Sequence, residues 1–147
     1  AIKQTENALR IHRMQPEYNL LMGECKMELG LFKEAIQYFS NVVQSRPRTI
    51  AGWEALIRCL YTAEMPEEAL TQLHIAMKVT NNKPVFLFYK AAILLSMGKQ
   101  KEAILQLEKA LTQAPKLLKK FIQLIPGSLQ NQQIVDVLAR FKRNKSI

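Results

Sequence analysis

The chain has 147 residues, of which 48% are hydrophobic and 22% are charged, fractions that are typical of a globular protein and exclude a disordered or low-complexity chain. Lys and Arg outnumber Asp and Glu by 21 to 12, so the net charge is +9, and no apolar run reaches the roughly 18 residues of a membrane-spanning helix. Two cysteines are too few for a disulfide framework.

The clearest feature of the sequence is a repeat with a period of 34 residues. The tripeptide Glu-Ala-Ile at 34–36 returns as Glu-Ala-Leu at 68–70 and as Glu-Ala-Ile at 102–104. Counting back 34 residues from the first copy leads to Ala1, and Leu9 then takes a position that is apolar in every later copy. The period is long enough for two short helices.

The chain opens inside a repeat. Residues 1–13 are predicted to be the second helix of a unit whose first helix is absent, so we expect the chain to be a section of a longer protein. The first full unit, 16–47, is predicted to form helices at about 16–29 and 33–45. Apolar side chains recur in it every three to four residues, and Gly30 suits the end of its first helix.

Two further units continue the same pattern. They are predicted at 50–81, with helices at about 50–62 and 66–79, and at 84–115, with helices at about 84–97 and 100–113. The position of Gly30 is held by Glu64 in the second unit and by Gly98 in the third. No Asn-Gly or Asp-Gly hairpin signal suggests β structure.

The last segment, 116–147, does not follow the 34-residue repeat. A helix at about 115–125 is expected to end at Pro126-Gly127, and Ser128 is expected to cap a final helix. Its polar residues suit the outer face that closes a stack of repeats. We therefore predict one domain over 1–147 that ends in a basic helical cap.

The 34-residue helix–turn–helix period, with a small residue in each helix, resembles the tetratricopeptide repeat. The residues that carry the resemblance are Met22, Gly23, Ala35, Phe39 and Pro47 in the first unit, Trp53, Leu56, Ala69 and Ala76 in the second, and Ala91, Ala103, Ala110 and Pro115 in the third. The match covers 1–115. It implies an all-α fold, a right-handed α-solenoid of stacked helix–turn–helix repeats with a C-terminal capping helical pair.

Helix packing gives an independent reason for the small residues. Two short helices cannot bury an apolar face alone, so neighbouring units must stack. Helix axes approach closely only where side chains are small, which predicts contact positions at Gly23, Ala35, Ala69, Ala91 and Ala103.

No constellation of residues indicates catalysis. The sequence lacks a nucleophile elbow, a glycine-rich phosphate loop and metal-ligand spacing, so we predict no enzyme, no metal site and no cofactor. Cys25 and Cys59 are 34 residues apart and are interpreted as small buried positions in successive first helices.

The resemblance implies that the first helices line a concave face on which ligands bind. The candidate groove residues carried over from it are Glu17, Leu20, Glu24, Glu28, Glu54, Arg58, Tyr61, Phe88, Tyr89 and Leu95. One end is acidic and the other apolar, so a peptide or amphipathic helix with basic residues followed by apolar ones would complement it. The alternative is that the glutamates are simply solvated.

The basic residues gather at the C-terminal end. The segment 116–147 has seven of them and one acid: Lys116, Lys119, Lys120, Arg140, Lys142, Arg143 and Lys145. Without a binding role, these residues would simply be a solvated helical end. With one, they would form a surface for nucleic acid or anionic lipid.

Taken together, these patterns predict a non-catalytic scaffold for protein–protein interaction, with nucleic-acid or anionic-surface binding as the alternative. The partner is another protein or peptide whose identity the sequence leaves open. A dimer through the N-terminal stacking face is a further hypothesis. Unpaired cysteines slightly favour a cytoplasmic location without excluding other compartments.

Overall fold

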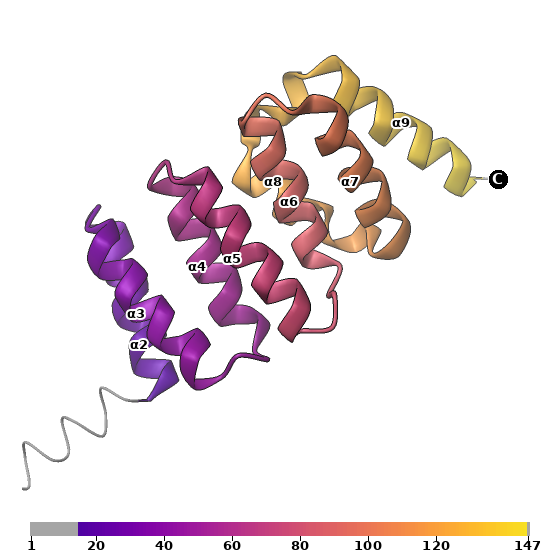
Figure 1. Cartoon of the computed structure of the whole chain (residues 1–147). Helices are drawn as coiled ribbons and strands as arrows, with labels where there is room; N and C mark the ends of the chain where they lie inside the picture. Colours follow the sequence, from indigo (N-terminus) through magenta and orange to yellow (C-terminus); the bar gives the residue numbers. More distant parts are fainter. Residues whose placement is uncertain (1–14, 147) are drawn as a thin grey trace, which may run out of the picture. The chain divides into compact units, whose positions relative to one another are not determined.

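A computed structural model of the chain describes residues 15–146. These residues contain helices and turns but no strand, which confirms the predicted all-α class (Figure 1). They divide into two compact units, one up to Asn81 and one from Asn82. The predicted helix over 1–13 lies outside the described residues, and the single-domain organisation stays a prediction.

Unit 1 consists of two helical hairpins. Its helices are α2 (Pro16–Glu28), α3 (Phe32–Ser45), α4 (Ile50–Thr62) and α5 (Pro66–Val79). Each helix packs against the next along the chain, and α2 also reaches α4. The observed bounds lie within a residue or so of the predicted ones, and Pro16 and Pro66 stand at the first position of α2 and α5, where proline is well tolerated.

The turn inside each hairpin has the same geometry in all three repeats. Gly30, Glu64 and Gly98 have φ values of +75°, +62° and +80°, the left-handed conformation that ends many helices. In each turn the next backbone N–H donates to a carbonyl five residues earlier: Leu31 to Lys26 at 2.9 Å, Met65 to Leu60 at 2.9 Å and Lys99 to Leu94 at 3.0 Å. The 34-residue period of the sequence therefore corresponds to a turn of the same geometry in each repeat.

Small residues allow the helices of unit 1 to approach closely. A Cβ at Gly23 would lie 2.7 Å from Cδ1 of Phe39, so the phenyl ring of α3 occupies the place of a side chain on α2. A Cβ at Gly52 would lie 2.7 Å from Cγ1 of Val42, at the contact of α4 with α3. Ala35 and Ala69 are fully buried, as predicted for contact positions.

A buried amide also fixes α2 against α3. Asn19, which takes the place of the usual aromatic residue, is 2% exposed. Its Nδ2 donates to the backbone oxygen of Gln15 at 3.0 Å, and its Oδ1 accepts from Nδ2 of Asn41 at 3.2 Å. Because a buried polar group is costly without partners, these bonds define the alignment of the two helices.

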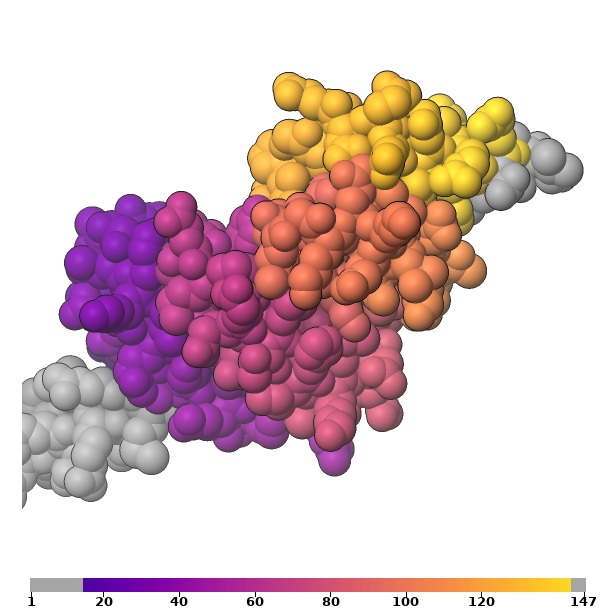
Figure 2. Space-filling view, turned by 45° about the horizontal axis from the view of Figure 1, so that its top comes forward, coloured from indigo at the N-terminus to yellow at the C-terminus, as the bar shows by residue number. Residues whose placement is uncertain are grey.

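Unit 2 begins with the third hairpin, α6 (Val85–Ser96) and α7 (Gln100–Gln113). The C-terminal segment follows as the 3₁₀ turn η1 (Pro115–Leu117), α8 (Leu118–Leu124), the 3₁₀ turn η2 (Pro126–Gln130) and α9 (Gln132–Ser146). α8 packs on α6, and α9 packs on η2 and α7. Figure 2 shows the side chains of α9 and α7 lying against one another on the surface.

The predicted cap of the final helix is wrong. Ser128 lies inside η2, where it is 2% exposed and its hydroxyl has no hydrogen-bond partner among the described residues. The cap is Asn131, whose Oδ1 accepts from the backbone N–H groups of Gln133 at 3.0 Å and Ile134 at 3.4 Å. Pro126-Gly127 leads into a 3₁₀ turn rather than directly into the helix, so α9 begins later than expected.

None of the described helices is both long and apolar enough to cross a membrane.

Candidate functional site

Unit 1 contains a cleft where the predicted groove begins. Its volume is about 280 Å³, and it is lined by Glu24, Met27, Glu28, Phe39 and Arg58. Glu24, Glu28 and Arg58 belong to the predicted set, and the structure brings these three together. The cleft therefore lies between the first helices of two successive repeats, α2 and α4.

The repeat geometry places each of these side chains. Glu24 and Glu28 are four residues apart on α2, so both project from the same face of that helix. Arg58 stands on α4, at the other side of the cleft. Phe39 comes from α3 and is fully buried, with its ring pressed on Gly23, so it lies beneath the cleft and presents no surface of its own to a ligand.

The cleft is acidic along α2 and has a cation opposite. Glu24, Glu28 and Arg58 are all exposed, and within the described residues none of the three has an ion-pair partner. The Arg58 side chain donates from Nε to the carbonyl oxygen of Glu54 at 3.4 Å, a bond within its own helix. The two carboxylates are therefore available to a cationic group, and the guanidinium to an anionic one.

Glu17 was predicted in the groove but is engaged elsewhere. Its Oε1 accepts from the Arg46 guanidinium at 2.9 Å, at the end of α3, and both side chains are exposed. The pKa of Glu17 lies below its usual value, first because of a backbone hydrogen bond at the start of α2 and then because of Arg46. Glu17 does not line the cleft.

Three other predicted residues of unit 1 flank the cleft without lining it. Leu20 on α2 and Glu54 and Tyr61 on α4 are half-buried. The lining also includes Met27, which was expected on the groove side of its helix, and Phe39, which is absent from the predicted site. Phe39 belongs to a second helix and carries a core motif position, so the sequence offered no signal that it also underlies a surface cleft.

The apolar end of the predicted groove needs correction. Phe88 and Tyr89 are 0% and 1% exposed, so neither presents surface to a ligand. Both belong to α6 in unit 2, which is apolar on nearly every side and is accordingly buried over most of its length. Leu95, on the same helix, is half-buried.

The predicted basic residues are distributed over three elements of unit 2. Lys116 lies in η1, Lys119 and Lys120 in α8, and Arg140, Lys142 and Arg143 in α9. Of these, Lys120 is half-buried and the others are exposed. The side chain of Lys145 lies outside the described residues.

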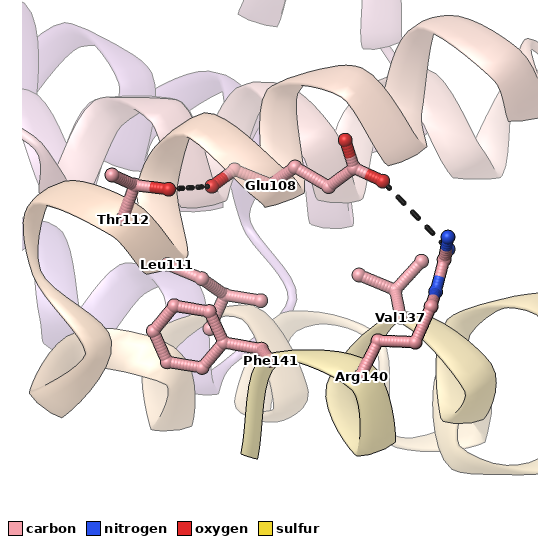
Figure 3. Close-up of a pocket in the computed structure, with 6 residues that line it drawn as sticks. All are labelled: Glu108, Leu111, Thr112, Val137, Arg140 and Phe141. Carbon is pink, nitrogen blue, oxygen red and sulfur yellow. Dashed lines mark hydrogen bonds and ion pairs between the residues drawn. The ribbon is translucent and has the colours of Figure 1, made fainter. Parts of the chain in front are cut away.

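A second cleft, which the sequence did not indicate, lies between α7 and α9 (Figure 3). Its volume is about 300 Å³, and its lining residues are Glu108, Leu111, Thr112, Val137, Arg140 and Phe141. Arg140 reaches towards Glu108, 3.8 Å away, and the Phe141 ring lies beside Leu111. The ion pair is exposed, so it contributes little stability, but it occupies one of the predicted basic residues.

The cysteines differ from each other, contrary to the sequence prediction. Cys59 is fully buried, and this burial raises the pKa of its thiol to about 11. Cys25, at the same position one repeat earlier, is exposed. Within residues 15–146, no group of three or more His, Cys, Asp or Glu side chains could hold a metal ion.

The helical hairpins of the structure agree with a match of the sequence to a known protein family. Residues 16–49 and 87–117 match the family model of the tetratricopeptide repeat. The chain contains tetratricopeptide repeats. The matched regions correspond to the first and third hairpins, the two that end their first helix with Gly30 and Gly98.

Two solved structures share this fold. The crystal structure of MamA is 17% identical with a TM-score of 0.66, and the alignment covers 96% of this chain and 84% of that one. TTC0263, a thermophilic tetratricopeptide-repeat protein of Thermus thermophilus, is 19% identical with a TM-score of 0.61. That alignment covers 97% of this chain and 87% of TTC0263. A search of curated protein sequences gave no match. These likenesses establish the fold and leave the ligand open.

Proposed function

We propose that this tetratricopeptide-repeat chain is a non-catalytic scaffold for protein–protein interaction that binds a peptide or helix in the cleft between α2 and α4. The family generally serves to hold protein partners, which supports the coarse role. The observation that supports the location is the cleft of unit 1, where Glu24, Glu28 and Arg58 line the walls together with the apolar side chain of Met27.

The cleft selects for a basic ligand with an apolar residue beside its charge. A Lys or Arg side chain of the ligand pairs with Glu24 and Glu28, whose carboxylates have no ion-pair partner within the described residues. An apolar side chain of the same ligand lies against Met27, which lines the cleft. Arg58 at the opposite wall disfavours a second cation there, which sets the order of charged and apolar residues along the ligand.

The test starts from a displayed library of short random peptides selected on the full chain. The expected winners are rich in Lys or Arg next to aliphatic or aromatic residues. One winner, labelled with fluorescein, is then titrated by fluorescence polarisation. Replacing both Glu24→Gln and Glu28→Gln is expected to weaken binding about fivefold, the effect of losing two exposed ion pairs worth roughly 0.5 kcal/mol each.

The matched control is Glu67→Gln plus Glu68→Gln. These two exposed glutamates stand on α5, outside the lining of the cleft, and their removal changes the net charge by the same amount. If binding weakens equally in both double variants, the effect is one of general charge, and the proposal that the ligand binds in the cleft is refuted. Selection of acidic peptides also refutes it.

Nucleic-acid or anionic-surface binding by the C-terminal basic segment stays a prediction without an observation that favours it. Of the basic residues whose side chains the structure describes, only Arg140 lines the cleft between α7 and α9, and it is paired with Glu108.

A further inference from the structure

The net charge of the chain belongs entirely to unit 2. Residues 1–81 contain nine Lys and Arg and nine Asp and Glu, so unit 1 is neutral. Residues 82–147 contain twelve basic and three acidic residues, which gives unit 2 a charge of +9. A unit with this balance attracts acidic partners and repels basic ones.

The cleft of Figure 3, between α7 and α9, adjoins a further cleft between the same helices. We call the one in Figure 3 the Phe141 cleft and the further one the Arg143 cleft. The Arg143 cleft has a volume of about 460 Å³, and its lining residues are Ile104, Gln133, Asp136, Ala139, Arg140 and Arg143. Arg140 therefore borders both clefts, and Arg143 adds a second cation three residues along the same face of α9.

Arg140 is only weakly held by the protein. Its Nη2 lies 3.8 Å from Oε1 of Glu108, which is too far for a hydrogen bond, and both side chains are exposed (Figure 3). Because such a pair contributes little stability, a carboxylate of a ligand can replace Glu108 at small cost. Arg143 has no ion-pair partner within the described residues, so it is directly available.

Each cleft also has one partly exposed apolar side chain. Phe141 in the Phe141 cleft and Ile104 in the Arg143 cleft are half-buried. Leu111 and Val137 are 1% and 3% exposed, so they lie beneath the Phe141 cleft and a ligand meets the Phe141 ring instead. The two clefts therefore offer apolar surface next to cations.

We propose that the Phe141 and Arg143 clefts form a docking surface for an acidic peptide. Asp or Glu side chains of the peptide pair with Arg140 and Arg143, and an apolar side chain packs against Phe141. This proposal is independent of the one for unit 1, whose ligand has the opposite charge.

A peptide fits these clefts better than a nucleic acid does. Glu108 and Asp136 line the same clefts and would repel a continuous row of phosphates. The charges of a peptide, by contrast, can be spaced so that they meet the arginines and avoid the two acids.

The test starts from a displayed library of short peptides built from acidic, small and apolar residues, selected on the full chain at physiological salt. The winner that binds most tightly is labelled with fluorescein and titrated by fluorescence polarisation. Arg140→Gln plus Arg143→Gln is expected to weaken binding about fivefold, the effect of losing two exposed ion pairs. The matched control is Lys116→Gln plus Lys119→Gln, which removes two exposed cations of unit 2 that line neither cleft and should leave the affinity nearly unchanged.

Glu108 gives the readout that is specific to this geometry. Glu108→Gln is expected to strengthen binding about twofold, because it releases Arg140 to the ligand. The matched control Glu102→Gln removes the same charge from an exposed position of α7 that lines neither cleft, and it should leave the affinity unchanged. Both side chains are exposed, so both variants should keep the circular dichroism of the original chain.

The apolar contact is tested separately. Phe141→Ala is expected to weaken binding severalfold, whereas Leu129→Ala, which truncates a residue of η2 that is 49% exposed and lines neither cleft, should not.

The proposal is overturned if no peptide of the library binds, or if the arginine and lysine variants weaken binding equally. It is also overturned if Glu108→Gln and Glu102→Gln change the affinity alike. A DNA duplex that binds the original chain more tightly than the peptide, and loses this affinity in the arginine variant, would make nucleic acid the occupant and overturn it as well.

Discussion

The contact of Gly23 with Phe39 gives the sharpest stability prediction. A Cβ at position 23 would lie 2.7 Å from Cδ1 of Phe39, a ring that is fully buried and cannot swing into solvent. Gly→Ala in the middle of a helix normally gains about 0.8–1 kcal/mol in helix propensity. Overpacking a buried contact costs roughly 1–3 kcal/mol. We therefore expect Gly23→Ala to lower the free energy of unfolding by about 1 kcal/mol.

The assay is urea unfolding followed by circular dichroism at 222 nm. A double-mutant cycle with Phe39→Leu isolates the clash, because the smaller side chain makes room for the methyl group. In that background Gly23→Ala should be neutral or stabilising. The matched control is Gly127→Ala, where a Cβ meets no atom within 4 Å. A Gly23→Ala chain more stable than the original would refute the reasoning, since propensity alone would then account for it.

Three further predictions follow from the turns, the buried thiol and the basic end. Glu64→Gly should stabilise the chain by about 0.5–1 kcal/mol in thermal or urea unfolding, because a non-glycine residue is strained at a φ of +62°; a loss of stability would contradict this. For Cys59, whose folded pKa is about 11, the unfolded thiol loses its proton at about pH 8.5. The contribution of this group to the free energy of unfolding should therefore be constant below pH 8 and be lost between about pH 9 and 11. Unfolding midpoints measured across this range should fall more steeply in the original chain than in Cys59→Ala. If the C-terminal segment binds nucleic acid, affinity for a labelled DNA duplex falls steeply with salt, and affinity that is constant from low to high salt would exclude it.

The sequence predicted those features of the fold that depend on interactions between residues close together in the chain. The 34-residue period sets the positions of Gly30, Glu64 and Gly98, and identical left-handed turns follow in all three hairpins. The small residue at Gly23 predicted a close contact, although not that Phe39 would fill it. Helix bounds and the all-α class follow from these local rules.

The site was harder to predict because exposure depends on neighbours that the period does not specify. Cys25 and Cys59 occupy equivalent positions, yet α3 covers only the second. Phe88 and Tyr89 were placed in the groove from the family pattern, whereas the apolar character of α6 on all sides buries them. Asn131 rather than Ser128 caps α9, because the turn after Pro126 extends further than its residues indicated.

The central claim is that a ligand binds between α2 and α4. The most direct measurement is a titration of the ¹⁵N-labelled full chain with a selected basic–apolar peptide, followed by amide chemical shifts. We predict the largest shifts around Glu24, Glu28 and Arg58, with α5 and α9 unaffected. Largest shifts on α9 or on the outward side of α5 would contradict the account.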